Sequence, residues 1–361
     1  MPSLFDPIQL GSVRAPNRVL MAPLTRGRAT RDFVPTPRMA TYYAQRASAG
    51  LILSEATGIS REGLGWPHAP GLWSAEQVEA WKPVTGAVHD AGGRIFAQLW
   101  HMGRLVHSSY LGGEAPVSSS ATRAPYKAHT YEGRIEYDRA CALRLDEIPR
   151  LLDDYRNAAR NALAAGFDGI QLHSANGYLI DQFLRDNSNF RDDSYGGPIS
   201  NRIRLLGEVT AALIEVAGAG RTAVRLSPNG DSQGVDDSDP EPLFTAAAAM
   251  LAGHGIAFLE LREPDATGTF GSTDVPRLSP AIRKVFPGPL VLNSDYDAAK
   301  GQAALDQGVA DAISFGRTFL ANPDLPRRYA EGLPVNEAVM ATWYSNGDDG
   351  YIDYPVAAAG S

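Results

Sequence analysis

The sequence predicts a (β/α)8 TIM barrel, in which eight parallel strands form a closed ring and helices cover its outer surface. Eight short runs rich in apolar and β-branched residues recur along the chain, and helical patterns lie between most of them. Within each run the apolar residues are continuous rather than alternating, as expected of parallel strands that are buried on both faces. The predicted strands cover residues 17–24, 50–57, 94–100, 166–173, 222–227, 256–261, 290–294 and 311–317.

The predicted helices carry end signals that support this alternation. Ser74 and Gln77 form the pattern of an N-terminal capping box, and Gly92, Gly166 and Gly308 are placed to end helices. The helices are expected at residues 35–49, 74–91, 145–165, 200–217, 240–252, 280–285 and 297–307.

Two segments fall outside the alternation of strands and helices. Residues 103–142, after the third strand, are rich in Ser, Gly, Pro and Arg and show no helical period, so we expect a lid or hairpin over the mouth of the barrel. The residues before the first strand are expected to form a small N-terminal hairpin that closes the bottom of the barrel. No linker, repeat or low-complexity segment divides the sequence, which predicts a single domain spanning residues 1–361.

Composition and charge argue against several classes of function. The formal net charge of −8 and the scattered basic residues disfavour a nucleic-acid partner. A single cysteine, Cys141, cannot build a disulfide framework or a cysteine-held zinc or iron–sulfur site within one chain, and the seven histidines show no metal-site spacing. The chain shows neither a secretory leader nor an uncharged apolar stretch of about 18 residues. We therefore expect a cytoplasmic protein, monomeric or homodimeric, that binds small molecules and neither metal nor membrane.

Polar side chains follow most of the predicted strands, and the carboxyl ends of the strands form the active-site face of such a barrel. After the last strand, Gly316 and Arg317 begin a short helix where an anion can bind. A flat ring with one anionic edge and a phosphate would need such groups, and flavin mononucleotide (FMN) meets that description. The polar strand ends are residues 21–26, 54–57, 98–101, 173, 225, 293–296 and 314–317.

The fourth predicted strand runs directly into the pattern His173-x-x-Asn176-x-Tyr178. Histidine and asparagine can both donate a hydrogen bond to a substrate oxygen, and a phenol beside them can deliver a proton. The structural alternative is a core histidine with satisfied hydrogen bonds, an asparagine that caps the next helix and a tyrosine that only packs.

The chain resembles the old yellow enzyme family of FMN-dependent ene-reductases over nearly its whole length. Thr25 stands where another branch of the family has Cys, which places the chain with the classical branch and its N-ethylmaleimide reductase-like members. The most specific motifs are residues 17–26, the His173 pattern with residues 179–183 and 189–197, residues 225–228, residues 315–317 with 322–324, and residues 350–355.

The resemblance implies an FMN site assembled from several strand ends. Arg225 would lie near flavin N1 and stabilise the reduced ring, with a buried ion pair as its alternative role. Ser294, Asp295, Gly316 and Arg317 would hold the ribityl phosphate, although the chain has Asn-Ser-Asp at 293–295 where many members carry a glycine pair. The other implied contacts to FMN come from Pro23, Leu24, Thr25, Ala56, Gln98, His173 and Phe315.

The resemblance also implies a mechanism in which NADH or NADPH reduces the flavin and leaves. His173 and Asn176 would then hold the oxygen of an activated alkene, which is an α,β-unsaturated carbonyl compound, a maleimide or a nitroalkene. Flavin N5 would pass hydride to the β carbon, and Tyr178 would protonate the α carbon. Aromatic residues are expected to wall the substrate pocket, namely Trp66, Trp100, Phe270 and Tyr344.

Three other kinds of barrel protein stand as alternatives. Another flavin barrel, such as an α-hydroxy acid oxidase or a dienoyl-CoA reductase, shares the fold, but the latter carries an iron–sulfur cluster that one cysteine excludes. A non-catalytic flavin or steroid binding protein is also possible on this scaffold. Such a protein would not need a proton donor beside side chains that hold a substrate oxygen. A Schiff-base aldolase needs a strand-borne lysine, whereas these lysines lie in predicted helices or loops: Lys82, Lys127, Lys284 and Lys300.

Overall fold

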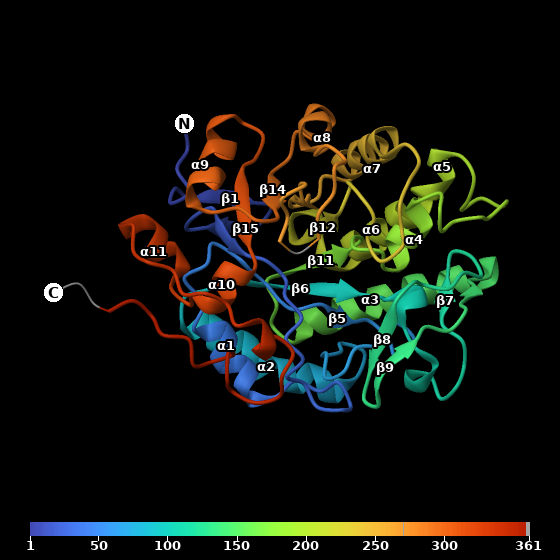
Figure 1. Cartoon of the computed structure of the whole chain (residues 1–361), viewed down its shortest axis with the longest axis horizontal. Coiled ribbons are helices and arrows are strands. Elements are labelled where there is room, and N and C mark those ends of the chain that lie inside the picture. Colours follow the sequence, from blue (N-terminus) through green and yellow to red (C-terminus); the bar gives the residue numbers. More distant parts are fainter. Residues whose placement is uncertain (270, 359–361) are drawn as a thin grey trace.

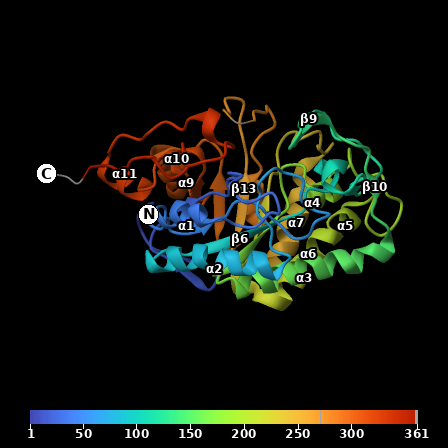
Figure 2. The same ribbon diagram turned by 90° about the horizontal axis from the view of Figure 1, so that it is seen from below.

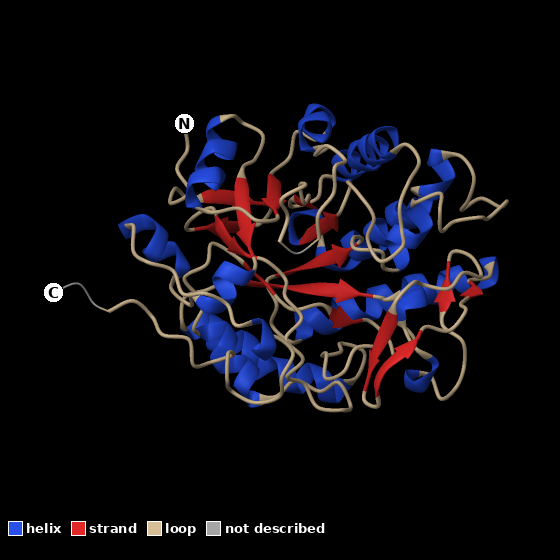
Figure 3. Ribbon diagram, in the orientation of Figure 1, coloured by secondary structure: helices blue, strands red, loops and turns tan. Residues whose placement is uncertain are grey.

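The structure, a computed structural model that describes residues 1–269 and 271–358, contains the predicted closed barrel (Figures 1 and 3). Each predicted run contributes one parallel strand, and a short strand β5 (Thr57–Gly58) extends the second run along β6. The ring closes because β15 pairs with β3 and β11 pairs with both β6 and β12. The strands are β3 (Val19–Met21), β4 (Ile52–Leu53), β6 (Ile95–Trp100), β11 (Gly169–His173), β12 (Thr222–Leu226), β13 (Leu259–Arg262), β14 (Leu290–Asn293) and β15 (Ala312–Phe315).

Helices cover the outside of the ring, as the view from below shows (Figure 2). The capping box is confirmed, because the Ser74 hydroxyl accepts from the Gln77 N–H and the Gln77 side chain accepts from the Ser74 N–H. Gly92, Gly166 and Gly308 all have positive φ, which confirms them as helix ends. The helices are α1 (Pro37–Ala44), α2 (Ala75–Asp90), α3 (Ile148–Ala164), α4 (Leu179–Leu184), α5 (Ile199–Arg202), α6 (Arg204–Ala217), α7 (Pro240–His254), α8 (Ser279–Val285), α9 (Ala298–Asp306), α10 (Arg317–Ala321) and α11 (Leu325–Glu331).

Both predicted hairpins are present. At the N-terminus, β1 (Ile8–Leu10) and β2 (Val13–Ala15) pair in antiparallel fashion, and their apolar side chains join the cluster inside the barrel. This hairpin closes the end of the barrel opposite the active-site face, as expected. After the third barrel strand, β8 (Lys127–Thr130) and β9 (Gly133–Glu136) form the second hairpin, which is flanked by β7 (Val117–Ser118) and β10 (Cys141–Ala142). Short 3-10 helices cover residues 103–105, 108–110, 145–147, 219–221 and 340–342.

Side chains alternate between the inside and the outside of the barrel along each strand. Leu259 and Leu261 of β13 belong to the cluster beneath the helices, whereas Phe258 belongs to the cluster inside the ring. Glu260 therefore points inward one layer above Phe258, toward the carboxyl end of the strands. The inner layer at this height is polar, and it forms the floor of the site described below.

The large cluster between strands and helices contains residues from Leu4 to Tyr351, so the two ends of the described chain share one core. On this basis we propose that residues 1–361 constitute one domain. Within the described ranges, none of the helices has both the length and the apolar character needed to cross a membrane.

Candidate active site

A cavity of about 930 Å3 opens at the carboxyl ends of the barrel strands. Every described residue that the sequence analysis assigned to a site lines this cavity, whereas Phe270 lies outside the described residues. Residues that are far apart in the sequence are therefore brought together on one face. The predicted residues on the lining are Pro23, Leu24, Thr25, Ala56, Trp66, Gln98, Trp100, His173, Asn176, Tyr178, Arg225, Ser294, Asp295, Phe315, Gly316, Arg317 and Tyr344.

Aromatic side chains form one wall of the cavity. The rings of Trp66 and Tyr344 meet edge to face with centroids 5.3 Å apart. On its other side Trp66 packs against His129 of the β8–β9 hairpin, at 4.5 Å between centroids. The insertion after the third strand thus supports this wall from behind, and none of residues 103–142, all of which are described, lines the cavity itself.

The floor of the cavity is a chain of buried hydrogen bonds between strand residues. Gln98 donates its amide N–H to the carbonyl oxygen of Gln171 over 2.8 Å, and Gln171 donates to the Glu260 carboxylate over 2.7 Å. Arg225 pairs with the same carboxylate at 2.6 Å and donates to Asn293 over 2.9 Å. The buried ion pair considered as the alternative for Arg225 is therefore present. Arg225 nevertheless lines the cavity, and its Nε has no hydrogen-bond partner among the described residues.

The residues predicted to bind the phosphate do not form a simple cluster of positive charges. Ser294 and Asp295 have φ of 112° and 50°, in the left-handed region that favours glycine, so the backbone takes the course expected of a glycine pair. The Asp295 carboxylate pairs with Arg317 at 2.5 Å, and Arg317 also donates to Thr269. Because a carboxylate repels a phosphate, only the backbone N–H of Asp295 is suited to hold one.

The His173 pattern curls around the tip of β11 and brings three rings together. The His173 and Tyr178 rings lie at 82° with centroids 4.9 Å apart, and Trp100 meets Tyr178 at the same distance and 81°. Asn176 (φ 60°) and Gly177 (φ 77°) make the turn between strand and helix. The sharp turn presents the imidazole, the amide and the phenol to one cavity.

The hydrogen bonds of His173 and Asn176 differ from those that the structural alternative requires. Nδ1 of His173 and Oδ1 of Asn176 are buried and have no hydrogen-bond partner in the part of the chain that the structure describes. The N-cap of α4 is Tyr178, and no side chain caps that helix. His173 is therefore not a satisfied core histidine, and Asn176 is not a helix cap. Both retain hydrogen-bonding capacity for a ligand.

Burial determines the protonation states of His173 and Tyr178. Desolvation, followed by the charges of Arg225 and Arg262, lowers the pKa of His173 well below its usual value, so the imidazole is neutral at pH 7 and can donate through one nitrogen. Desolvation raises the pKa of the Tyr178 phenol, and a hydrogen bond from Gln233 opposes part of this rise. Tyr178 therefore keeps its proton across the neutral range.

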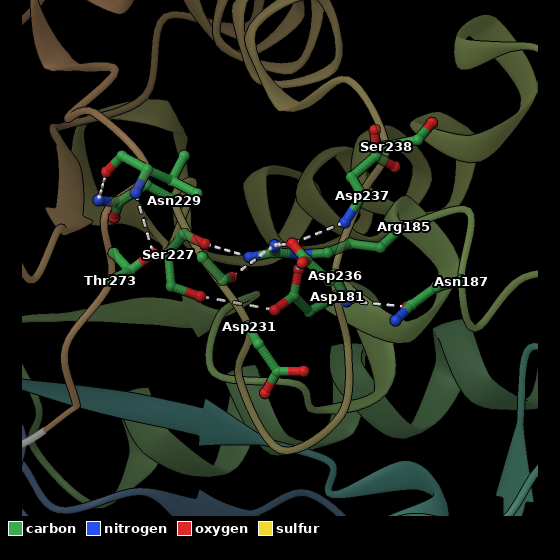
Figure 4. Close-up of polar contacts among 12 residues, drawn as sticks. Asp181, Arg185, Asn187, Ser227, Asn229, Asp231, Asp236, Asp237, Ser238 and Thr273 are labelled. Atoms are coloured by element: carbon green, nitrogen blue, oxygen red, sulfur yellow. Dashed lines mark hydrogen bonds and ion pairs between the residues drawn. The ribbon is translucent and has the colours of Figure 1, made fainter.

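Gln233 is a cavity residue that the sequence analysis missed. Its amide donates to the backbone carbonyl of Asn176 over 2.7 Å, and it lies against Tyr178. Gln233 belongs to the loop after β12. A buried ion pair between Asp181 of α4 and Arg185, at the end of that helix, ties this loop to the His173 turn (Figure 4). No sequence pattern near Gln233 signals this contact.

Arg262 is the second missed residue. It ends β13, lines the cavity, and has its pKa lowered to about 10 by burial and then by Arg225. The sixth predicted strand stopped one residue short of it, at 261. Its position at the carboxyl end of a barrel strand is the signal that identifies it.

Comparisons with known proteins agree on one family. The family model described as NADH:flavin oxidoreductase / NADH oxidase matches residues 3–336. The solved structure of an old yellow enzyme homologue from Zymomonas mobilis is 65% identical, with 99% of this chain and 100% of that chain covered and a TM-score of 0.98. Morphinone reductase, solved in complex with tetrahydroNAD, is 43% identical, with 99% and 98% covered and a TM-score of 0.93. The 12-oxophytodienoate reductase 1 of Oryza sativa subsp. japonica is 40% identical over 356 residues, which cover 98% of this chain and 92% of that protein.

Proposed function

The chain belongs to the NADH:flavin oxidoreductase / NADH oxidase family, and we propose that this FMN-dependent oxidoreductase of the old yellow enzyme type reduces activated carbon–carbon double bonds. The observation that carries the proposal is the group formed by His173, Asn176 and Tyr178. His173, whose Nδ1 has no partner among the described residues, and Asn176, whose amide NH2 can donate, line the same cavity as a buried, protonated phenol. Such a group can hold an oxygen and supply a proton.

The residues of the cavity fit FMN. Gln98 faces the cavity with its amide N–H already engaged by Gln171, which leaves its carbonyl oxygen to accept from the ring imide. The unpartnered Nε of Arg225 supplies a donor and a charge for the anionic edge of the ring. When bound, FMN would supply the hydride chemistry that links a nicotinamide reductant to the alkene. We assign the remaining contacts to Pro23, Leu24, Thr25, Ala56, Ser294, Phe315, Gly316, Arg317 and the backbone of Asp295.

In the proposed mechanism, His173 and Asn176 hold the carbonyl or nitro oxygen of the substrate. Their N–H groups stabilise the negative charge that grows on this oxygen as the double bond is reduced. Because His173 is neutral, it donates one hydrogen bond without giving up a proton. Tyr178, whose ring stands at 82° to the imidazole, protonates the α carbon from a separate direction. The proposed substrates are α,β-unsaturated carbonyl compounds, maleimides and nitroalkenes.

The proposed reductant is NADH or NADPH, which would visit the same face of the cavity and leave before the alkene binds. The sequence contains no Rossmann fingerprint that would give the nicotinamide a site of its own. Morphinone reductase, a relative of this chain, is solved in complex with tetrahydroNAD, which supports a nicotinamide as the reductant.

The purified protein is expected to be yellow and to release FMN, not FAD, on denaturation. The position proposed for the phosphate lies at the end of β15 and α10 begins directly after it, so we expect no second nucleotide site there. The absorption spectrum and chromatography of the released flavin check this expectation. A colourless protein that takes up no added FMN would contradict the proposed function as a whole.

Phenols are expected to bind the oxidised protein, because a phenolate oxygen resembles the substrate oxygen held by His173 and Asn176. Addition of p-hydroxybenzaldehyde should produce a long-wavelength charge-transfer band, and the double variant with His173→Ala and Asn176→Ala should lose it. A titration followed by absorbance measures the band. If the double variant keeps the flavin and an undiminished band, the substrate oxygen is held by other residues.

A further inference from the structure

We infer that Glu260 is a positioning residue that sets both the net charge and the hydrogen-bond polarity of the cavity floor, and through them the reduction potential of the bound flavin. This inference rests on the proposed function, since it concerns the cofactor that the cavity would hold. It adds a residue that the sequence analysis did not assign to any site.

The first step concerns charge. Glu260 is fully buried, and its Oε1 atom lies 2.6 Å from NH1 of Arg225 and 2.5 Å from the Ser314 hydroxyl, which donates to it. Arg225, which is 5% exposed, is the cation closest to this carboxylate and lines the cavity. The ion pair therefore offsets part of the positive charge that Arg225 directs at a ligand. A carboxylate beneath the cation disfavours additional negative charge in the cavity. Reduced FMN would bring such a negative charge to this position.

The second step concerns polarity. A carboxylate only accepts hydrogen bonds, so Glu260 requires Gln171 to present its NH2 group, as observed at 2.7 Å. The carbonyl oxygen of Gln171 must then face Gln98, whose NH2 group donates to it over 2.8 Å. The carbonyl oxygen of Gln98 is left for the cavity. One buried carboxylate thus determines, through two amides, whether the floor accepts or donates at the position of Gln98.

The substitution Glu260→Gln tests both effects with little change in shape. Two donors, Arg225 and Ser314, meet Oε1, so the new amide should keep its oxygen there and turn its NH2 toward Gln171. In that arrangement the NH2 groups of the new glutamine and of Gln171 would face each other. Gln171 and Gln98 should then both turn over, so that Gln98 presents its NH2 group to the cavity. The cation becomes uncompensated at the same time, which should favour reduced over oxidised FMN.

The expected result is a higher midpoint potential of the bound flavin in Glu260→Gln. The ratio of the dissociation constants of oxidised and reduced FMN should rise roughly tenfold or more, which is about 30 mV for a two-electron couple. Dye-equilibrated reductive titration of the holoenzyme measures the potential, and fluorescence titration of the apoprotein measures the affinity for oxidised FMN. A purely structural role for Glu260 would lower affinity for both redox states without moving the potential.

Glu263→Gln is the matched control, because Glu263 is also a buried carboxylate just beyond β13. Its Oε1 accepts from the backbone N–H groups of Leu278 and Ser279 at 2.6 and 2.9 Å, and it does not line the cavity. This variant should leave the flavin potential at the wild-type value. An equal shift in both carboxylate variants would overturn the inference.

Glu260→Asp keeps the test decisive if Glu260→Gln does not fold. The shorter side chain retains the charge but withdraws it from Arg225, so its potential should lie between those of the wild type and Glu260→Gln. A potential at or below the wild-type value in either variant overturns the role of Glu260 and leaves the proposed function intact. Failure of the wild-type protein to bind FMN or to reduce alkenes would instead contradict the proposed function.

Discussion

Replacement of Tyr178 by Phe is expected to slow reoxidation of the reduced protein by cyclohexenone roughly 10²-fold or more, the usual scale of a general-acid contribution. Reduction by NADH or NADPH should change little, because that half-reaction needs no proton from the phenol. The ring contacts with Trp100 and His173, at 4.9 Å each, do not involve the hydroxyl and should survive. Stopped-flow absorbance at the flavin band measures both half-reactions separately.

Two comparisons make the Tyr178→Phe result specific. A nitroalkene should be reduced with a much smaller loss of rate, because its product can leave before it is protonated on carbon. Tyr155→Phe removes another fully buried phenol, one that lies in the core cluster beneath the helices, and should affect neither half-reaction. Equal slowing of both half-reactions in Tyr178→Phe would mean that the tyrosine shapes the cavity instead of supplying a proton.

The pH dependence of the same reaction follows from the two shifted groups. The raised pKa of Tyr178 keeps the acid protonated as the pH rises through the neutral range, and the lowered pKa of His173 keeps the imidazole neutral there. Cyclohexenone reduction should therefore vary little between about pH 7 and 9. A rate that falls steeply across this window would show that a different group is the acid.

Much of the barrel was predictable because its signals are local. Continuous apolar runs, the Ser74 capping box and glycines at helix ends each depend on a few neighbouring residues, and all of them are confirmed. The polar strand ends that line the cavity followed from one rule of the fold, that parallel strands end at the same face, whereas lining residues in loops, such as Trp66 and Tyr344, did not follow from it. That rule gathers His173 and Arg225 without any knowledge of their partners.

The pairing of side chains across the barrel was not predictable in the same way. Glu260 lies on the inner face of a run that otherwise looks like an ordinary buried strand, and its contacts to Gln171 and Arg225 depend on the strand register. From the sequence alone, an ion pair of Arg225 and a flavin contact therefore stand as alternatives. In the structure a single guanidinium pairs with Glu260 and also lines the cavity.

The conformation of Ser294 and Asp295 shows a second limit. Positive φ at a non-glycine residue costs conformational energy, so the sequence favours a different backbone course there. Tertiary contacts overcome this preference, including the pairs that Asp295 makes with Arg317 and Thr269. The sequence therefore does not predict the observed backbone, because the chain departs here from the glycine pair that many family members carry.

Replacement of Arg185 by Met is expected to lower the free energy of unfolding by about 3–5 kcal/mol, because it leaves a buried carboxylate without its partner. Arg185 and Asp181 are both fully buried and lie 2.9 Å apart. Arg185 also donates to the backbone carbonyls of Ser227 and Gly230 (Figure 4). The variant should therefore release the loop that carries Gln233, in addition to losing stability.

The loop gives the Arg185→Met prediction a second readout in activity. Asp181 accepts from the backbone N–H of Gly177 over 2.9 Å, so one ion pair holds both the turn that carries Asn176 and the loop that carries Gln233. Cyclohexenone reduction should fall further than FMN binding does, since most of the proposed cofactor contacts lie on other strand ends. Arg150→Met breaks an exposed ion pair with Glu62 at 2.9 Å and should cost about 1 kcal/mol or less in urea unfolding. If the two variants unfold at the same urea concentration, the buried pair does not hold this side of the active site together.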